Sequence, residues 1–221
     1  MLDPAARAEL KTLPGDLADS VARRLVAAGL AEDPGLAYQH AQEARRLAAR
    51  VGIVREAVGI AAYQAERWAE AIAELRAARR LTGRAIGLPL MADSERALGR
   101  LDRALALVHE PQARGLDRAT QIELAIVESG IRRDQDMPEA ALLALRVPEL
   151  AGDRTYPWSA RLFYAYADAL LDLGRVDEAR DWFARAAGAD PDGETGAALR
   201  YEELDDVTVE DLEEAGDADG A

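Results

Sequence analysis

The sequence predicts an all-α protein made of a run of short helix pairs that stack on one another. Apolar residues fall at helical spacing along most of the chain, and no segment alternates convincingly with a period of two. One alanine position returns at intervals of 33 to 39 residues, at Ala37, Ala71, Ala104, Ala140 and Ala179. A step of this length accommodates two antiparallel helices and two turns, and such a unit buries its apolar face against its neighbours.

The last repeat shows this pattern most completely. Helically spaced apolar residues run from Phe163 to Leu173. Gly174 then marks a turn, because glycine adopts at little cost the left-handed conformation that ends many helices. In the next helix Ala179 allows close approach of the paired helix, and Phe183 fills the space beside it. Pro191 blocks further continuation of the helix.

This pattern resembles the tetratricopeptide repeat family. In the last repeat the resemblance is carried by Ala167, Gly174, Ala179, Phe183, Ala186 and Pro191. Earlier repeats keep part of the pattern, namely Ala37, Ala44, Gly59, Ala71, Leu75, Ala78, Ala92, Gly99, Ala104 and Val108. The third repeat has Pro111 where a small residue is usual, so its second helix is expected to end early.

The resemblance implies a right-handed α-solenoid of about five helix-turn-helix repeats with capping helices. The repeats are expected near 18–51, 52–84, 85–120, 121–159 and 160–193. Residues 1–16, with Pro4 in the first turn, and residues 194–204 are expected to form the caps, since terminal repeats need a polar outer face. The predicted solenoid domain is 1–204.

Acidity is concentrated at the C-terminal end of the chain. The net charge is −14, and residues 201–221 hold ten acidic residues and no basic ones. The preceding residues hold 31 acidic and 27 basic residues, a net charge of −4. Few apolar residues and many like charges predict a disordered acidic tail at 205–221. A solubilising role is favoured for it over docking or self-inhibition.

The composition also bears on the compartment. Cysteine is absent, which excludes disulfides and thiolate chemistry. No signal peptide is visible, and no apolar run approaches the roughly 18–20 residues of a membrane-spanning helix. A cytoplasmic protein without a membrane segment is therefore expected. Lys11 is the only lysine, and the preference for arginine indicates a high-GC bacterial genome.

The sequence contains no recognisable catalytic pattern. The two histidines, His40 and His109, have no spaced carboxylate or cysteine partners, and neither a phosphate-binding loop nor a glycine-rich nucleotide fingerprint occurs. Three tryptophans fall at helix-packing positions, Trp68, Trp158 and Trp182. We therefore expect a protein that is not an enzyme and that uses no metal or cofactor.

A possible binding groove lies along the first helices of the repeats, which line the concave face in the family that the chain resembles. The last repeat offers a polar stripe beside its apolar one, and the repeat step places equivalent residues in earlier repeats. The predicted groove residues are Tyr63, Gln64, Asp93, Arg96, Ser129, Arg132, Arg133, Arg161, Tyr164, Asp168 and Asp172, with Glu56 beside them. Such a groove suits an extended peptide or a partner helix.

Two functions remain open from the sequence. The favoured one is an adaptor or scaffold that binds another protein in the predicted groove. The alternative is an RNA- or ribosome-associated protein, because arginines recur on the second helices of the first two repeats, at Arg45, Arg46, Arg50, Arg76, Arg79, Arg80 and Arg84. Nearby glutamates such as Glu43, Glu70 and Glu74 are expected to neutralise part of this patch.

Overall fold

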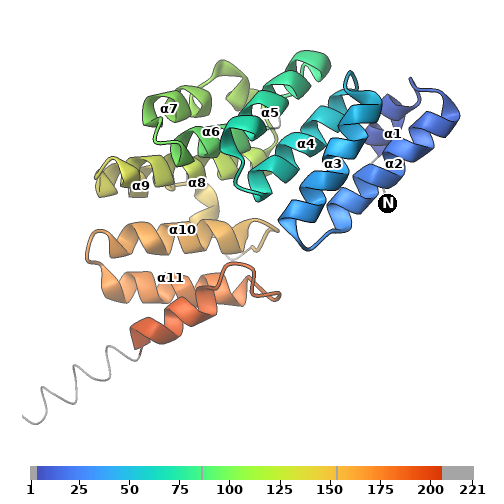
Figure 1. The fold of residues 1–221 in the computed structure, drawn as a ribbon. Coiled ribbons are helices and arrows are strands. Elements are labelled where there is room, and N and C mark those ends of the chain that lie inside the picture. Colours follow the sequence, from blue (N-terminus) through green and yellow to red (C-terminus); the bar gives the residue numbers. More distant parts are fainter. Residues whose placement is uncertain (1–3, 86, 153, 206–221) are drawn as a thin grey trace, which may run out of the picture. The chain divides into compact units, whose positions relative to one another are not determined.

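The computed structural model describes residues 4–85, 87–152 and 154–205, and within these ranges the chain forms helices and no strands (Figure 1). The all-α class predicted from the sequence is confirmed. The chain divides into two compact units, Met1–Leu116 and Asp117–Ala221, which are described separately below.

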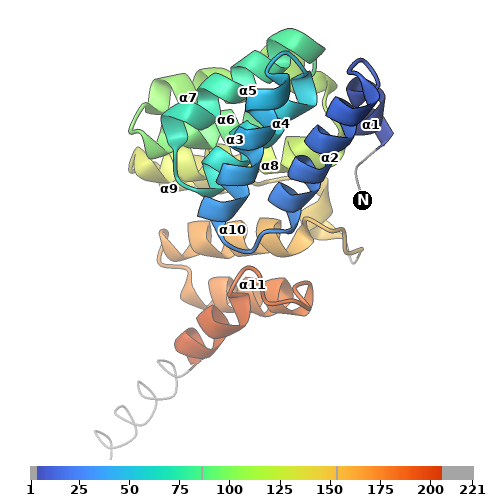
Figure 2. The same cartoon turned by 45° about the vertical axis from the view of Figure 1, so that its right-hand side comes forward.

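The first unit is a series of helix hairpins preceded by a short helix. Within it, α2 pairs with α3, α4 with α5 and α6 with α7, and each pair packs on the next (Figures 1 and 2). The leading helices α2, α4 and α6 also contact one another in that order. The elements are α1 (Pro4–Leu10), α2 (Gly15–Leu30), α3 (Pro34–Ala48), α4 (Gly52–Gln64), α5 (Trp68–Thr82), α6 (Leu88–Ala97), α7 (Leu101–Val108) and the 3₁₀ turn η1 (Pro111–Gly115).

The second unit contains two hairpins, α8–α9 and α10–α11. Helix α10 packs on both members of the preceding hairpin and on α11. The elements are α8 (Arg118–Asp134), α9 (Pro138–Ala144), the 3₁₀ turn η2 (Pro148–Ala151), α10 (Ser159–Leu171) and α11 (Val176–Gly188), followed by helical residues 197–205.

Aspartate occupies the N-cap position of two helices, α3 and α8. The Asp33 carboxylate accepts a hydrogen bond of 2.6 Å from the Leu36 N–H at the start of α3, where Pro34 occupies the first helical position. At the start of α8, Asp117 accepts hydrogen bonds from the side chain and N–H of Thr120, and these lower the pKa of the Asp117 carboxyl. Both helices therefore begin where a side chain satisfies free N–H groups.

One turn geometry recurs in the hairpins α4–α5, α6–α7, α8–α9 and α10–α11. The residue that reverses the chain is left-handed in each of them, with φ of 57° at Glu66, 70° at Gly99, 57° at Asp136 and 69° at Gly174. The following N–H bonds back to a carbonyl five residues earlier, as in Arg175 N to Leu170 O at 3.0 Å. The turns predicted at Gly99 and Gly174 are confirmed, and the same conformation at Glu66 and Asp136 was not predicted.

The predicted packing positions of the last repeat lie in the core of the second unit. Ala179, Phe183 and Ala186 are fully buried, in one cluster with Trp158. The tilted and edge-on ring contacts of Phe163, Tyr164 and Tyr166 with residues of α11 add to this cluster.

The core of the first unit is aliphatic within the described residues. Two of its buried clusters consist of alanine, valine and leucine, and Ile72, Leu88 and Met91 are buried as well. Gly59 lies so close to Leu75 on α5 that an added β-carbon would come within 2.6 Å of the Leu75 side chain, which confirms the small-residue position predicted there. Helix α7 ends at Val108 and Pro111 opens η1, so the early helix end predicted in this repeat is confirmed.

The chain termini bear on three further predictions. Helix α1 begins at Pro4, inside the N-terminal segment predicted as a cap, and the helical residues 197–205 fall in the predicted C-terminal cap. Of the predicted acidic tail, only Asp205 lies within the described residues, where its carboxylate is 3.4 Å from Arg180. Among the described helices, none combines the length and the apolar character that a membrane span requires.

Candidate functional site

Arg133 joins the two first helices of the second unit. From α8 its guanidinium donates hydrogen bonds of 2.5 and 3.2 Å to Asp172, at the end of α10, and one of 3.0 Å to Asp168. The hydrogen bond to Asp172 is the main cause that raises the pKa of Arg133 above its ordinary value. These three predicted groove residues therefore form one ion-pair cluster that holds α8 against α10.

Arg161 makes the reciprocal connection, from α10 back to α8, where it forms an ion pair with Glu123. The Arg161 side chain is 60% exposed, whereas that of Glu123 is 21% exposed. Burial raises the pKa of the Glu123 carboxyl, and the charge of Arg161 opposes this effect. The face shared by α8 and α10 thus carries ion pairs in which each helix supplies an arginine to a carboxylate of the other. Among these charged side chains, only that of Arg161 is largely exposed to solvent.

Other predicted groove residues of this unit take different positions. The Tyr164 ring meets Phe183 edge-on at 5.1 Å and is half-buried. Arg132 lies 3.6 Å from Glu128, one turn earlier on the same helix. Ser129 is only 2% exposed, so its assignment to an open groove was wrong. Helix α8 packs against both α9 and α10, and its Ser129 position lies in the buried part of that packing.

The first unit has an equivalent polar cluster between α4 and α6. The Tyr63 hydroxyl donates a hydrogen bond of 2.5 Å to Asp93, and Arg96 forms an ion pair of 2.6 Å with the same carboxylate. The Tyr63 ring also meets Trp68 edge-on at 5.3 Å. Gln64 is exposed beside this cluster. Four predicted groove residues of this unit therefore lie near one another, three of them in direct contact.

Glu56 lies near the other end of the α4 face. Its carboxylate and that of Glu9 are 4.0 and 3.8 Å from Arg84. Glu9 also accepts a hydrogen bond of 2.8 Å from the Ile53 N–H, so α1 supplies a cap for the start of α4. Burial raises the pKa of Glu56, and the charge of Arg84 opposes this effect.

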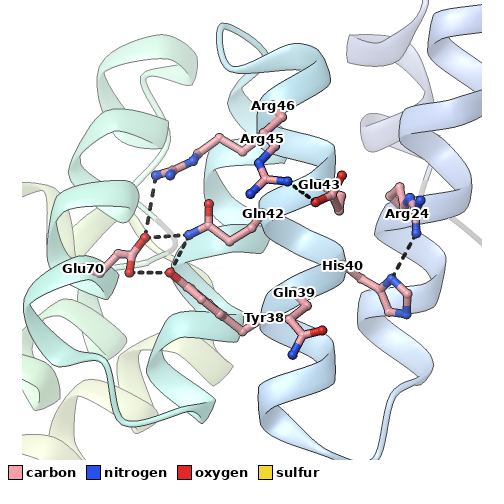
Figure 3. Close-up of a pocket in the computed structure, with 9 residues that line it drawn as sticks. All are labelled: Arg24, Tyr38, Gln39, His40, Gln42, Glu43, Arg45, Arg46 and Glu70. Atoms are coloured by element: carbon pink, nitrogen blue, oxygen red, sulfur yellow. Dashed lines mark hydrogen bonds and ion pairs between the residues drawn. The ribbon is translucent and has the colours of Figure 1, made fainter.

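The sequence reasoning missed a cleft of about 490 Å³ over α2, α3 and α5, which we call the α3 cleft (Figure 3). On its α5 side the Tyr38 hydroxyl donates a hydrogen bond of 2.6 Å to Glu70, and Gln42 donates to both Tyr38 and Glu70 at 2.6 Å. Arg45 lies 3.6 Å from Glu70. On the α2 side, an Arg24 guanidinium nitrogen is 3.5 Å from Nδ1 of His40.

The pKa of the Tyr38 phenol is raised in this setting. Partial burial raises the pKa of its phenol, and the hydrogen bond to the Glu70 carboxylate raises it further. The guanidinium of Arg67 stacks 4.4 Å over the Tyr38 ring. Tyr38 and Glu70 are 32 residues apart, close to the repeat step, and this spacing was the signal in the sequence that could have identified the pair.

The predicted basic patch is largely neutralised, mostly by glutamates that lie outside the helix of the arginine concerned. Arg45 pairs with Glu74 at 2.5 Å, Arg76 with Glu95 at 2.9 Å and Arg79 with Glu110 at 2.6 Å. Arg46 pairs with Glu43 within α3, as predicted for neighbours at helical spacing. Within the described ranges, Arg50 and Arg80 are the exposed members of the predicted patch whose side chains make no hydrogen bond or ion pair.

Neither chemistry nor similarity identifies a reaction. The described residues contain no group of three or more histidines, cysteines or carboxylates placed to hold a metal ion. A scan of the sequence against models of protein families found no match, and a search of curated proteins found no significantly similar one. The candidate site is therefore defined by geometry alone, as the polar faces of α4–α6 and α8–α10, which we call the first-helix face of each unit.

Proposed function

We propose that the chain is a tetratricopeptide-like α-solenoid that binds another protein, an extended peptide or a partner helix, through its first-helix faces. The proposed repeats are the five predicted from the sequence, with the terminal helices as caps. In this role the protein is a non-enzymatic adaptor or scaffold of the cytoplasm.

The recurring turn supports the repeat assignment. Four hairpins reverse direction at residues 66, 99, 136 and 174, each with a left-handed residue and the same backbone hydrogen bond. Each of these turns lies between the two helices of a predicted repeat. Hairpins of one geometry that pack pair on pair within each unit are what a helical-repeat array requires.

The observation that carries the binding proposal is the fixed polar surface of the first helices. In the first unit Asp93 holds Tyr63 and Arg96, and in the second Asp168 and Asp172 hold Arg133. Side chains that are already ordered lose less conformational entropy when a partner binds. Tyrosine and arginine are also the residue types that contribute most strongly to protein interfaces.

The nucleic-acid alternative receives less support. A phosphate-binding surface needs arginines that remain available to phosphates, and electrostatic attraction that extends over several nucleotides. Here the main arginines of the predicted patch already bind glutamates, and the body of the chain outside residues 201–221 has a net charge of −4 from 31 acidic and 27 basic residues.

Two matched substitutions test which face binds. Ile60 on α4 is 37% exposed at the first-helix face, and Leu81 on α5 is 51% exposed on a second helix. We expect Ile60→Arg to remove the proteins that the wild-type chain captures from a lysate of its own organism, identified by mass spectrometry. We expect Leu81→Arg to leave that set unchanged, with both variants melting within a few degrees of the wild type.

The opposite pattern would move the binding surface to the second helices. Retention of every captured protein by both variants would leave no role for the first-helix face of the first unit. Arg133 is unsuitable for this test, because its replacement would leave Asp168 and Asp172 without their partner and would change stability as well as binding.

A further inference from the structure

A second cleft lies in the second unit, away from the first-helix face. It has a volume of about 250 Å³ and lies between the loop that precedes α10 and the last turn of α11. The side chains that matter for its chemistry are Arg154, Thr155, Phe163 and Arg185, and Gly152 contributes backbone. We call it the Arg154–Arg185 cleft.

Arg185 is held in a defined orientation at the cleft. Its guanidinium stacks 4.1 Å over the ring of Trp182 and 4.8 Å over that of Phe163. Its two terminal nitrogens also donate to the carbonyl oxygens of Leu150 and Gly152 at 3.4 Å, through three contacts. A guanidinium has five N–H donors, so donors remain for a ligand after these contacts are made.

Arg154 is held by a separate aromatic stack. Its guanidinium lies 4.9 Å over the Tyr156 ring, and Tyr156 stacks face to face on Trp158 at 4.6 Å with an interplanar angle of 4°. Trp158 is 8% exposed and belongs to the core of the unit. The aromatic stack therefore connects Arg154 at the surface to a fixed part of the fold.

These two arginines differ from most others of the second unit. Arg118 binds Glu149, Arg133 binds Asp168 and Arg175 binds Glu178. Within residues 117–152 and 154–205, Arg154 and Arg185 have no carboxylate partner, and no carboxylate lines the cleft that they share. Two oriented cations on aromatic surfaces therefore face a space in which the described residues supply no opposite charge.

We infer that the Arg154–Arg185 cleft binds the side-chain carboxylates of an acidic peptide segment on a protein partner. Arginine donors match the geometry of a carboxylate, and a charge-assisted hydrogen bond is about twice as strong as a neutral one. Phe163, which lines the cleft, offers apolar contact to the same segment. A run of phosphates fits less well, because the cleft is small.

The inference concerns a different surface from the proposed function, so each can fail alone. The probe is a capped pentapeptide that alternates glycine with two glutamates, titrated into the ¹⁵N-labelled full chain at low salt. The indole N–H signals of Trp158 and Trp182 report binding at the cleft. We expect both signals to shift in a saturable way, and we expect no shift with the same peptide carrying glutamines.

Variants locate the binding to the two arginines. Arg154→Gln, alone or combined with Arg185→Gln, is expected to weaken binding of the pentapeptide at least tenfold. Arg146→Gln is the control, since Arg146 is an exposed arginine of the same unit that has no ion pair within the described ranges. Arg154→Gln leaves the carbonyl contacts of Arg185 intact, so its effect does not depend on the loop position that Arg185 holds.

Four outcomes would overturn the inference. They are unshifted indole signals, equal weakening by Arg146→Gln, tighter binding of inorganic phosphate than of the pentapeptide, and tighter binding of a short oligouridylate. Asp153 lies outside the described residues and next to Arg154 in the sequence. We expect Asp153→Asn to retain or tighten peptide binding, and a loss of binding in this variant would also contradict the inference.

Discussion

The two units bury different side chains between their helices. In the second unit α10 and α11 meet through rings, with the completely buried Phe183 against Tyr164 and with Phe163 and Tyr166 against Trp182. In the first unit the buried apolar residues that the structure describes are aliphatic, and two almost fully buried glutamates lie among the helices. The same hairpin geometry therefore accommodates both buried aromatic rings and buried ion pairs.

The two buried glutamates of the first unit are paired in the same way. Glu74 on α5 binds Arg45 from α3 and Arg55 from α4, so that one carboxylate connects three helices. Glu95 on α6 is 1% exposed and binds Arg76 from α5 and Arg100 from the following turn. Each glutamate thus has two arginines, which satisfy the requirement that a buried charge be paired.

The largest expected effect is in the aromatic core. Phe183→Ala should lower the free energy of unfolding by about 3–5 kcal/mol, because it removes a completely buried ring and leaves a cavity. Chemical denaturation followed by circular dichroism measures this loss. Phe183→Leu should cost less than half as much, and equal costs for the two variants would mean that the core collapses around the site.

In the first unit, the buried charge of Glu95 should be the sensitive point. Replacing both Arg76 and Arg100 by alanine leaves this carboxylate buried without a partner, which should cost about 3 kcal/mol or more. Glu95→Gln should cost less, because the two arginine side chains are 48% and 45% exposed and can be rehydrated. The comparison of the two units would fail if the double arginine variant unfolded like the wild type in urea.

The sequence predicted well those features that depend on residue type alone. Glycine at 99 and 174 indicated left-handed turns, and the stripe through Ala179 and Phe183 indicated a buried helix face. The same turn at Glu66 and Asp136 could not be predicted, because neither residue prefers a positive φ. There the geometry is imposed by the packing of the helices on either side.

The candidate site was predicted less well than the fold. The groove residues were transferred from the last repeat by the repeat step, and that step varies from 33 to 39 residues. An error of one residue rotates the exposed face of a helix by about 100°, and Ser129 accordingly lies in the core. The ion pairs could not be predicted either, because 27 basic and 41 acidic residues allow many pairings.

Substitutions at the left-handed turn that both units share should change stability by a smaller amount, and the backbone geometry gives the sign of each change. Gly174→Ala should destabilise by about 1 kcal/mol, because a left-handed φ of 69° strains any L side chain although no heavy atom lies within 4 Å of the added carbon. Glu66→Gly and Asp136→Gly should stabilise by up to about 1 kcal/mol. The gain should be larger for Glu66, since aspartate tolerates this conformation better than glutamate. Thermal melts of the three variants in parallel provide the measurement.

The smallest expected effect is a change in pH dependence at the α3 cleft of the first unit. Tyr38 has a raised pKa in the folded chain, chiefly from partial burial and then from its hydrogen bond to Glu70. A group whose pKa is raised by folding contributes stability below its unfolded pKa of about 10, and this contribution is lost as the pH rises through the folded value. Tyr38→Phe should therefore be less stable than the wild type by about 1 kcal/mol near pH 8, through loss of one hydrogen bond.

The difference between wild type and Tyr38→Phe should then shrink as the pH approaches about 11. The chain has six tyrosines, but the other five titrate in both proteins and cancel in the difference. Tyr201→Phe is the control, because Tyr201 makes no side-chain hydrogen bond within the described ranges. Urea unfolding at several pH values between about 8 and 11 gives both differences. A gap between wild type and Tyr38→Phe that stays constant over this range would show that folding does not raise the pKa of the Tyr38 phenol. A gap of zero throughout would show that the polar contact between α3 and α5 contributes nothing to the attachment of these two hairpins.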